Sequence, residues 1–285
     1  MISDARRINQ ILRSRGFFPS DFTLDLISEH LPPLQRTRFP PDFTRARKIL
    51  PDIALPASFR GPVGLIVETR CHDNLAFVTQ QVCNDLVLPV VLIHGSENRS
   101  FIKERLPDEL KTTERLFLVE LKTATLSLAD YNGLFLLPKF WSSFESNDQV
   151  LVFQTDVVFC RNSPYRLSDF QDFAYIGSSW DRSRPVGLIL DGGYGGVSLR
   201  DPRALTGLLN QFPANDWPGG EDGYFAFYAD LMDLKLARPQ DSDRFCTQDR
   251  FVGPSLAVHK PTRLSKAERE ALLSYCPDVH RLFET

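Results

Sequence analysis

The triplet Gln154-Thr155-Asp156 follows an apolar run at residues 150–153 and precedes a second one at 157–159. The carboxylate of Asp156 is therefore predicted to stand at the edge of a hydrophobic core. A buried carboxylate without a partner is costly, so it binds either a proton or a cation. A divalent metal ion that bridges a diphosphate is one such partner, and an aspartate that merely turns the chain at a strand end is the alternative. Spacing alone leaves both interpretations open.

Two other segments bring polar groups to the edge of the predicted core. Glu221 and Asp222 lie in the first turn of a helix expected over residues 221–231. Carboxylates there complement the helix dipole by about 0.3–1 kcal/mol, but either could instead be a general base that deprotonates a sugar hydroxyl. His259 ends an apolar run at 256–258 and is either a core-edge histidine or a metal ligand beside Asp156. The adjacent Lys260 would add positive charge near a diphosphate.

Glycines occupy positions 192, 193, 195 and 196, just before a strand-like run at 197–200. This spacing is not a dinucleotide-binding fingerprint, because that motif needs a helix after the glycines to hold phosphate at its N-terminus. Gly195 and Gly196 are predicted either to let the backbone pass close to a ligand or to form a plain turn.

Strands and helices alternate from Gly61 onwards, which predicts an α/β domain with a mainly parallel sheet. Strands are expected at residues 63–67, 89–93, 116–119 and 150–153, with helices between them at 74–86, 101–106 and 128–144. Ligands bind at the carboxyl ends of the strands in such sheets. This rule places three segments on one edge of the sheet: Glu68-Thr69-Arg70, His94-Gly95 and Gln154-Thr155-Asp156.

The two ends of the chain are predicted to differ from this domain. Residues 1–60 are expected to form a partly helical appendage in which Ser20 caps a helix over 21–31. Basic side chains gather in this region: Arg36, Arg38, Arg45, Arg47 and Lys48. They form either a solvated face or a patch for an anionic acceptor or an acidic membrane surface.

The main domain is expected over residues 61–262, with later strands at 174–177, 196–199 and 256–258. The remaining residues, 263–285, are expected to form a helical tail. Ser265 and Glu268 have the spacing of a capping box at the start of that helix.

The composition excludes some classes of protein. The chain has 285 residues, a net charge of -3 and a pI near 6.0, whereas nucleic-acid binding requires a concentrated basic face. Its five cysteines are dispersed and lack metal-binding spacing, so a reduced, cytoplasmic setting is the simplest interpretation. No apolar stretch reaches the roughly 18 residues of a membrane span, and no secretion signal is recognisable at the start of the chain.

Taken together, these segments resemble an uncharacterised family of GT-A-type glycosyltransferases found in bacterial and viral surface-glycan loci and in some fungi. The resemblance covers residues 62–260 and rests on the order of its short motifs: Val67-Glu68-Thr69-Arg70, Tyr131-Asn132, Phe140-Trp141, Phe153-Gln154-Thr155-Asp156, Tyr175-Ile176-Gly177 with Trp180, Gly195-Gly196-Val197-Ser198-Leu199-Arg200, Glu221-Asp222 and His259-Lys260. It implies a GT-A-like, Rossmann-like fold in which a mixed, mainly parallel central sheet is flanked by helices.

The resemblance also implies roles for individual residues. Asp156 looks like the metal-binding acid of a D-x-D element, and Gln154 stands where the first acid is usual, which should weaken the binding of Mn²⁺ or Mg²⁺. His259 looks like the late metal ligand, and Asp222, next to Glu221, looks like the base of an inverting enzyme. The nucleotide-sugar donor would lie against a larger set: Glu68, Thr69, Arg70, Gln154, Thr155, Asp156, Gly195, Gly196 and Lys260.

The predicted function is transfer of a sugar from a nucleotide-sugar donor to a hydroxyl group of a glycan or a lipid-linked glycan. A nucleotidyltransferase is a first alternative, although the segment Thr69-Arg70-Cys71-His72 is not the glycine-rich basic loop that grips a triphosphate. A second alternative is an inactive protein that binds or scaffolds glycans. The products separate the three: nucleoside diphosphate, pyrophosphate, or none.

Overall fold

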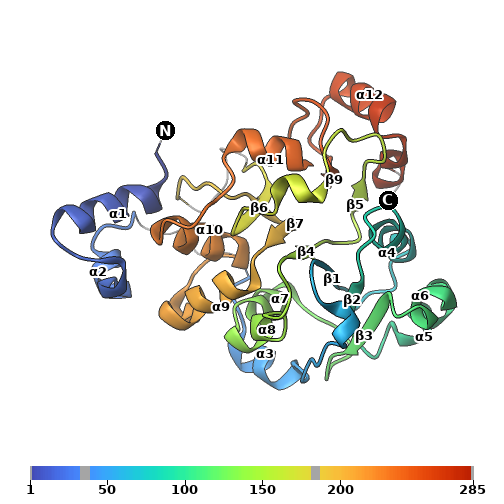
Figure 1. Cartoon of the computed structure of the whole chain (residues 1–285), viewed down its shortest axis with the longest axis horizontal. Coiled ribbons are helices and arrows are strands. Elements are labelled where there is room, and N and C mark those ends of the chain that lie inside the picture. The colour runs from blue at the N-terminus through green and yellow to red at the C-terminus, as the bar shows by residue number, and fades with distance from the viewer. Residues whose placement is uncertain (1, 33–38, 181–186, 284–285) are drawn as a thin grey trace.

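The computed structural model describes residues 2–32, 39–180 and 187–283, and its centre is a six-stranded sheet in the order β3-β2-β1-β4-β7-β6 (Figure 1). The strands are β1 (Val63–Val67), β2 (Val90–His94), β3 (Leu116–Glu120), β4 (Val150–Val152), β6 (Tyr175–Ser178) and β7 (Tyr194–Arg200). The first four strands in this order are parallel, and β7 is antiparallel to both of its neighbours. The predicted α/β class with a mixed, mainly parallel sheet is confirmed.

After β4 the chain enters a second, smaller sheet. It contains β5 (Val157–Phe159), β9 (Ala257–His259) and β8 (Cys246–Thr247), in the order β5-β9-β8. Between the two sheets the chain passes through residues 153–156, so Asp156 directly precedes β5. Val157 pairs with His259 in the antiparallel ladder of β5 and β9. This switch of sheets brings Asp156 and His259 together although about a hundred residues separate them in the sequence.

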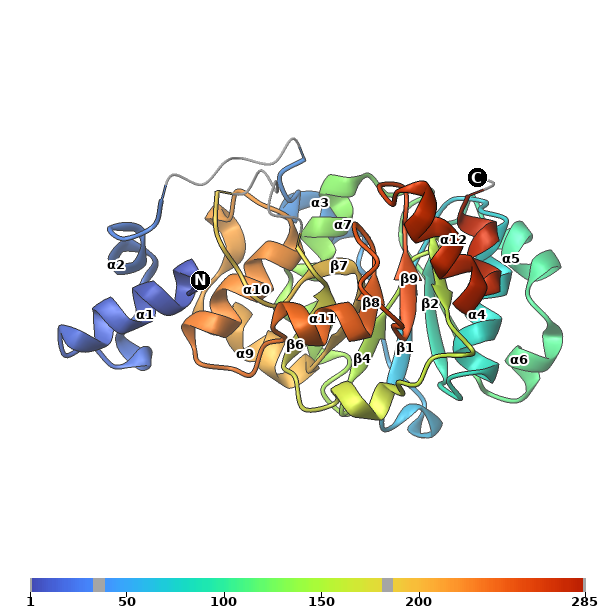
Figure 2. The same cartoon turned by 90° about the horizontal axis from the view of Figure 1, so that it is seen from above.

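Helices cover both faces of the central sheet. They are α1 (Asp4–Ser14), α2 (Leu24–Ser28), α3 (Phe43–Ile49), α4 (Asn74–Asn84), α5 (Arg99–Arg105), α6 (Asp108–Thr112), α7 (Leu128–Phe135), α8 (Pro138–Ser142), α9 (Pro202–Gln211), α10 (Glu221–Leu231), α11 (Pro239–Phe245) and α12 (Lys266–Tyr275). Side chains of α7 to α10, α1 and α3 pack on one face, and those of α4, α5 and α11 pack on the other. Figures 1 and 2 show α1 and α2 at one end of the molecule and α5 and α6 at the other. No helix among the described residues is long and apolar enough to span a bilayer.

The helix expected over residues 128–144 is wrong in its length. The structure has two helices there, α7 and α8, because Pro138 begins the second one. Proline cannot donate an amide hydrogen bond and clashes with the preceding turn, so it ends a helix at the residue before it. Ser127 and Asp130 form a capping box at the start of α7, with the hydroxyl of Ser127 accepting from the amide of Asp130.

The N-terminal region contributes to the main core. Ala5 and Ile8 of α1 are buried in the same hydrophobic cluster as α10, and Ile49 of α3 joins that cluster beside α7. The predicted helix over residues 21–31 is shorter than expected, and Thr23 caps it in place of Ser20, because its hydroxyl accepts from the amide of Leu26. The domain boundaries at residues 60 and 262 stay predictions. Arg36 and Arg38, which belong to the predicted basic cluster, lie outside the described residues.

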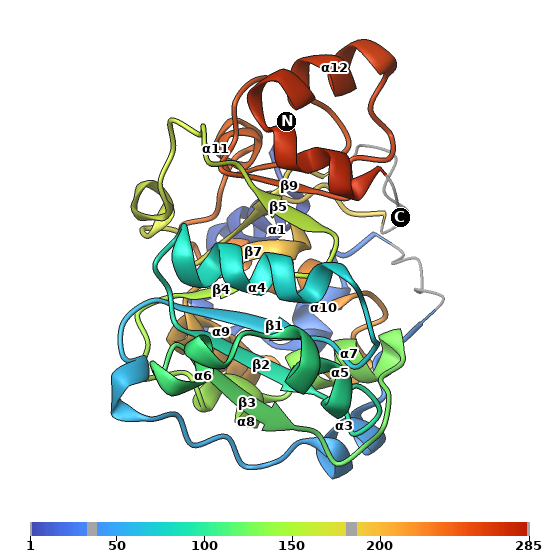
Figure 3. The same ribbon diagram turned by 90° about the vertical axis from the view of Figure 1, so that its right-hand side faces the viewer.

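The C-terminal tail folds over the smaller sheet, on the side of the molecule away from β3 (Figure 3). The capping box at the start of α12 is confirmed, since Ser265 accepts from the amide of Glu268 and donates to its carboxylate. Cys160, next to β5, forms a disulfide with Cys276, directly after α12. The expectation that all five cysteines are reduced is therefore wrong for this pair, because the fold brings together two thiols that are far apart in the sequence.

Removing the disulfide is expected to lower the free energy of unfolding by about 2–4 kcal/mol, because a cross-link across a long loop restricts the unfolded chain. The two cysteines are separated by 116 residues. Scanning calorimetry of a Cys160→Ser/Cys276→Ser variant should show a melting temperature several degrees below that of the unreduced wild type. Reductant should lower the wild-type value and leave that of the variant unchanged. Equal melting temperatures without reductant would contradict a stabilising cross-link.

Candidate functional site

The loop after β1 is tied to the loop after β4. Glu68 is buried and accepts three hydrogen bonds from Arg70, from its amide and two guanidinium nitrogens at 2.7–2.9 Å. The hydroxyl of Thr155 also donates to the Glu68 carboxylate, to Oε2 at 3.3 Å. The hydrogen bond to Glu68 raises the pKa of Arg70, whose side chain is 70% exposed. Arg70 is thus a permanently charged group held rigidly at its base and open to a ligand at its outer face.

Two buried asparagines hold this edge of the sheet in place. Asn74, the first residue of α4, donates to the carbonyl of Thr155 at 2.6 Å. Asn98, which directly precedes α5, donates to the carbonyls of Glu68 and Arg70 at 2.9 and 3.2 Å. Sequence reasoning missed both residues. Their position at the starts of two helices that follow central strands was the available signal.

Gln154 faces α7. The hydroxyl of Tyr131, on α7, lies beside the side chain of Gln154. Burial, followed by the nearby charge of Glu221, raises the pKa of Tyr131, so this hydroxyl stays protonated. Tyr131 therefore lies between the donor-side triplet and the start of α10. The sequence motif Tyr131-Asn132 carried no assigned role, and the packing of α7 places its two residues near Gln154 and Glu221.

Asp156 and His259 face each other across the junction of the two sheets. Nε2 of His259 lies 3.2 Å from Oδ1 of Asp156, and Nδ1 lies 2.8 Å from Oε1 of Gln248. Burial alone would raise the pKa of Asp156, but the neighbouring His259 and, more weakly, Lys260 hold it below its ordinary value. Asp156 is therefore a carboxylate. Its side chain is 38% exposed, so one side of it is open to a ligand.

The two glycines that open β7 lie between the candidate groups. A Cβ atom on Gly196 would stand 2.1 Å from Cε1 and 2.5 Å from Nε2 of His259. A Cβ atom on Gly195 would stand 2.5 Å from Oε1 of Glu221 and 3.1 Å from Cβ of Asp222. Only glycine leaves room at both positions. The dipeptide therefore brings the His259–Asp156 pair and the Glu221-Asp222 pair against one short stretch of backbone.

Glu221 and Asp222 differ in their surroundings. Glu221 is buried, and its two carboxylate oxygens accept from the guanidinium of Arg200 at 2.6 and 3.0 Å. Asp222 is half-buried, and its Oδ1 accepts from the amide of Gly223 at 2.7 Å. A base must present a lone pair to its substrate, and Glu221 spends both oxygens on an arginine. The geometry thus favours Asp222 over Glu221 for that task.

The remaining predicted residues lie at the borders of the site. Thr69 is buried, and its hydroxyl accepts from the amide of Leu126, which ties the β1 loop to the segment before α7. Lys260 is exposed and has a positive φ of 42°, and its amide donates to the carbonyl of Asp156 at 3.0 Å. His94 is buried, with Nδ1 2.8 Å from the carbonyl of Gly95. The structure thus gathers the predicted residues at one edge, while their roles in binding and catalysis stay predictions.

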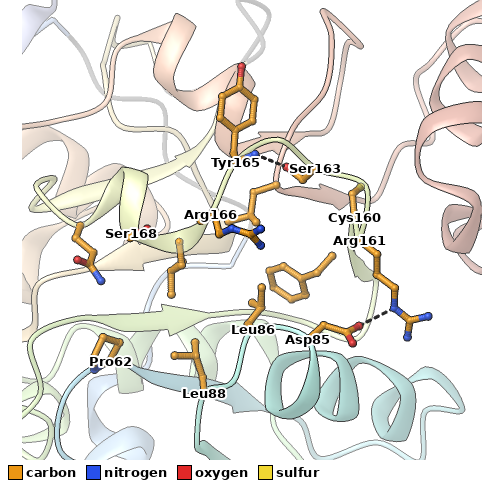
Figure 4. A pocket seen from close by; sticks show the side chains of 14 residues that line it. Pro62, Asp85, Leu86, Leu88, Cys160, Arg161, Ser163, Tyr165, Arg166 and Ser168 are labelled. Atoms are coloured by element: carbon orange, nitrogen blue, oxygen red, sulfur yellow. Dashed lines mark hydrogen bonds and ion pairs between the residues drawn. The ribbon is translucent and has the colours of Figure 1, made fainter.

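A separate pocket of about 290 Å³ lies at the opposite, amino-terminal edge of the sheet (Figure 4). Pro62, just before β1, and Leu88, just before β2, form part of its wall, and Arg166 points into it. It shares no lining residue with the site described above. We assign the candidate site to the carboxyl edge because charged side chains converge there, and not because of the volume of a pocket.

The donor atoms of Asp156 and His259 fit a divalent cation. Oε1 of Gln248 accepts from the hydroxyl of Ser178 and lies beside Nδ1 of His259, so Nδ1 is the donor in this contact and Nε2 is the nitrogen that would face a cation. Nε2 is buried and makes no hydrogen bond with any described residue, despite its 3.2 Å distance from Asp156. Two ligands about 2.1 Å from one octahedral ion, at right angles, are roughly 3 Å apart. The described residues hold no cluster of three or more His, Cys, Asp and Glu side chains, so water or phosphate oxygens would complete the coordination.

Replacing Gly196 with Ala is expected to lower the rate of the predicted sugar transfer about 100-fold, because a displacement of roughly 1 Å in a site costs that much. The new methyl group would overlap the ring of His259 and push it away from Asp156. Steady-state kinetics of Gly196→Ala would measure the loss. Gly207→Ala is the matched control, since a Cβ atom there meets nothing within 4 Å. Unchanged kinetics in Gly196→Ala would show that His259 has no part in the site.

The fold and site define an α/β protein with paired acidic groups and a histidine at the carboxyl edge of its sheet. The chain belongs to the family described as "Protein of unknown function (DUF5672)", whose model matches residues 115–259. That span includes Gln154-Thr155-Asp156, the two glycines of β7, Glu221-Asp222 and His259. Glu68 and Arg70 lie before the matched segment. No curated protein has a significant sequence match to the chain.

Solved structures with partial similarity include three transferases. The glycosyltransferase GlyE of Streptococcus pneumoniae has 13% identity and a TM-score of 0.45, over 78% of this chain and 63% of its own. A glycosyltransferase involved in glycosylation of the major capsid of PBCV-1 has 15% identity and a TM-score of 0.38, over 75% and 98%. A protein described as a glucose-1-phosphate thymidylyltransferase of Bacillus anthracis has 11% identity and a TM-score of 0.37, over 59% and 83%. These values establish neither a common activity nor a common substrate.

Proposed function

We propose that this protein is a glycosyltransferase that moves a sugar from a nucleotide-sugar donor to a hydroxyl group. One observation carries the proposal: Gly195 and Gly196 stand in contact distance of Glu221-Asp222 on one side and of His259, paired with Asp156, on the other. The groups proposed to bind the diphosphate and to accept the proton therefore lie close together, which supports sugar transfer. The mixed sheet is the architecture that the GT-A resemblance implies.

Asp222 is the base in the proposed reaction. An oxygen of the acceptor hydroxyl forms a bond to the anomeric carbon while its proton passes to the carboxylate of Asp222. The bond from that carbon to the diphosphate breaks, and its electron pair leaves with the nucleoside diphosphate. Attack from the side opposite to the leaving group inverts the anomeric configuration. Removal of this proton contributes about 10²–10⁴-fold to the rate of such reactions.

The donor diphosphate is proposed to lie between the β1 loop and Asp156. Arg70, anchored by Glu68, would contact it, and Lys260 would add a second positive charge from the side of β9. Gln154, which lies beside Tyr131, would hydrogen-bond the ribose, and the hydrogen bond from Thr155 to Glu68 links the two loops. These contacts orient the donor and hold its leaving group beside positive charge.

Asp156 and His259 are the residues that would hold Mn²⁺ or Mg²⁺. When bound, such an ion would neutralise charge on the departing diphosphate. With Gln154 in place of a second acid, the protein offers one carboxylate and one imidazole, so we propose that the affinity for the free ion is low and rises when the donor is present. Phosphate oxygens would then supply the missing ligands.

The direct test is a screen of nucleotide sugars for release of nucleoside diphosphate, with and without Mn²⁺. Release of nucleoside diphosphate supports a transferase, release of pyrophosphate indicates a nucleotidyltransferase, and neither indicates a binding or scaffold protein. Thermal shift gives a second reading that needs no acceptor. A donor at a hundred times its dissociation constant should stabilise the fold by roughly 2.7 kcal/mol, and no shift with any donor would sink the proposal.

The acceptor is proposed to be a glycan or a lipid-linked glycan. Arg45, Arg47 and Lys48 of α3 are the described members of the basic N-terminal cluster. Arg45 is held by the buried Asp130 at 3.0 Å, which fixes this helix against α7. Contact of the cluster with an anionic acceptor or an acidic membrane surface stays a proposal, as does a cytoplasmic setting. Co-sedimentation with vesicles that contain phosphatidylserine would test the membrane contact.

A further inference from the structure

Arg200, the last residue of β7, carries a charge into the centre of the hydrophobic core. Its side chain is 0% exposed. Four aromatic rings enclose its guanidinium carbon at centroid distances of 5.2–5.7 Å: Phe135, Trp141, Tyr175 and Phe225. Burial opposes the charge of Arg200, but the adjacent Glu221 holds its pKa above the ordinary value, so the group is always a cation.

The polar partners of Arg200 all belong to the candidate site or its support. Both terminal nitrogens donate to Glu221, and Nη2 also donates to the carbonyl of Gly195 at 3.3 Å. Nε donates to the hydroxyl of Ser198 at 2.8 Å. A buried ion pair of this kind adds little stability compared with a well-packed apolar pair, because desolvation of both charges offsets their attraction. Stability alone is therefore a weak explanation for the pair.

The start of α10 explains why such a pair is placed here. Gly220, the N-cap of α10, has no side chain that could accept from the amides of the first turn. Glu221 is the first residue of the helix, and its amide faces Oδ1 of Asn132 at 3.4 Å. The fork of Arg200 grips the Glu221 carboxylate at two points, which fixes direction as well as distance. Asp222 is the next residue, so its direction depends on this grip.

We infer that Arg200 is a positioning residue: by clamping Glu221 with two hydrogen bonds, it fixes the first turn of α10 and aims Asp222 at the acceptor hydroxyl. The clamp also binds both oxygens of Glu221 and stabilises it as a carboxylate, which favours Asp222 as the member of the pair that accepts the proton. This role rests on the proposed function for its catalytic consequence. The effect on the first turn of α10 does not depend on that function.

The same helix offers a matched control at its other end. Asp230, near the end of α10, is 2% exposed and accepts from Arg6 of α1 at 2.9 Å. Arg6 and Arg200 thus each pair with a buried carboxylate of α10, one far from the site and one next to it. Substitution of either arginine leaves a buried carboxylate without its cation and should lower stability. Only substitution of Arg200 should change the chemistry.

The test compares Arg200→Lys and Arg200→Met with Arg6→Met at a temperature where calorimetry shows each variant to be folded. Lysine keeps the charge and loses the two-point grip. Both Arg200 variants are expected to lower kcat roughly 100-fold, the cost of a misplaced catalytic group, with the KM for the donor unchanged. Arg6→Met should lower the melting temperature and leave kcat unchanged. If Arg200→Met does not fold, Arg200→Lys and Glu221→Gln give the comparison.

A kcat in Arg200→Lys equal to that of Arg6→Met would overturn the inference and reduce the pair to core structure. A second readout works even if the wild type transfers no sugar. The amide of Tyr224 bonds to the carbonyl of Gly220 and reports on the first turn of α10. Its hydrogen exchange should accelerate more in Arg200→Lys than the loss of global stability accounts for, whereas in Arg6→Met it should follow global stability alone. Equal exchange in Arg200→Lys and wild type would overturn the clamp itself, whatever the activity screen shows.

Discussion

Replacing Asp222 with Asn is expected to lower turnover by about 10²–10⁴-fold, the range that a general base contributes. Asparagine has nearly the same shape and can keep the contact with the amide of Gly223, but it cannot take up the acceptor proton. Because Asp222 does not contact the donor in the proposed arrangement, the dissociation constant of the donor should not change. Calorimetric titration with the nucleotide sugar and steady-state kinetics measure the two quantities separately.

Asp216→Asn is the control for this experiment. Asp216 is exposed in the turn before α10 and carries the same charge, so its substitution changes the net charge equally. Its kinetics should match those of the wild type. If Asp222→Asn keeps wild-type turnover, Asp222 is not the base, and the inverting mechanism proposed above is wrong. A loss of donor affinity equal to the loss of turnover would instead place Asp222 on the donor side.

Replacing Asp156 with Ala is expected to remove both donor affinity and turnover. Loss of a partner in the outer shell of a metal site costs roughly 10–100-fold in metal affinity, and loss of a direct ligand should cost at least as much. The variant keeps His259 but leaves its Nε2 facing a void. Titrations of donor and Mn²⁺ together, monitored by calorimetry, should show weaker binding of each. Restoration of affinity at high Mn²⁺ would support a metal role in particular.

Asp172→Ala is the matched control, because this exposed carboxylate lies at the opposite edge of the sheet, where it pairs with Lys235 at 3.0 Å. Its donor affinity should equal that of the wild type.

The lowered pKa of Asp156 predicts how donor binding depends on pH. The carboxylate is ionised above its ordinary pKa and stays ionised some way below that value. Donor affinity that depends on Asp156 should therefore fall only as the pH drops through that lowered value. Full donor affinity in Asp156→Ala would refute the donor site.

Much of the central sheet was predictable from the sequence. The strand at 63–67 and the helix at 221–231 have the predicted bounds, and the other predicted strands shift by no more than two residues. Apolar runs of about five residues mark strands buried on both faces, and their helical partners show a period near 3.6. The helix at 128–144 was too long because Pro138 interrupts a pattern that otherwise continues.

The sequence predicted several residues of the candidate site but not the contacts between them. Asp156, Asp222 and His259 each end or follow a recognisable element, so the topology of an α/β sheet was enough to group them. Gln248 was missed, and Arg200 was part of a motif but had no assigned role, because neither residue type nor spacing shows which polar groups a fold will bury together. The disulfide was missed for the same reason, since 116 residues lie between its cysteines.

The triplet Gln154-Thr155-Asp156 shows which features local sequence determines and which depend on the tertiary structure. Local sequence determined that a polar turn follows a buried strand, because apolar runs on both sides leave the turn at the edge of the core. Only the tertiary structure decided that Asp156 meets His259, that Gln154 meets Tyr131 and that Glu221 meets Arg200. These contacts join segments from different parts of the chain. Their geometry depends on strand pairing and helix packing, and on two glycines that let side chains approach the backbone of β7.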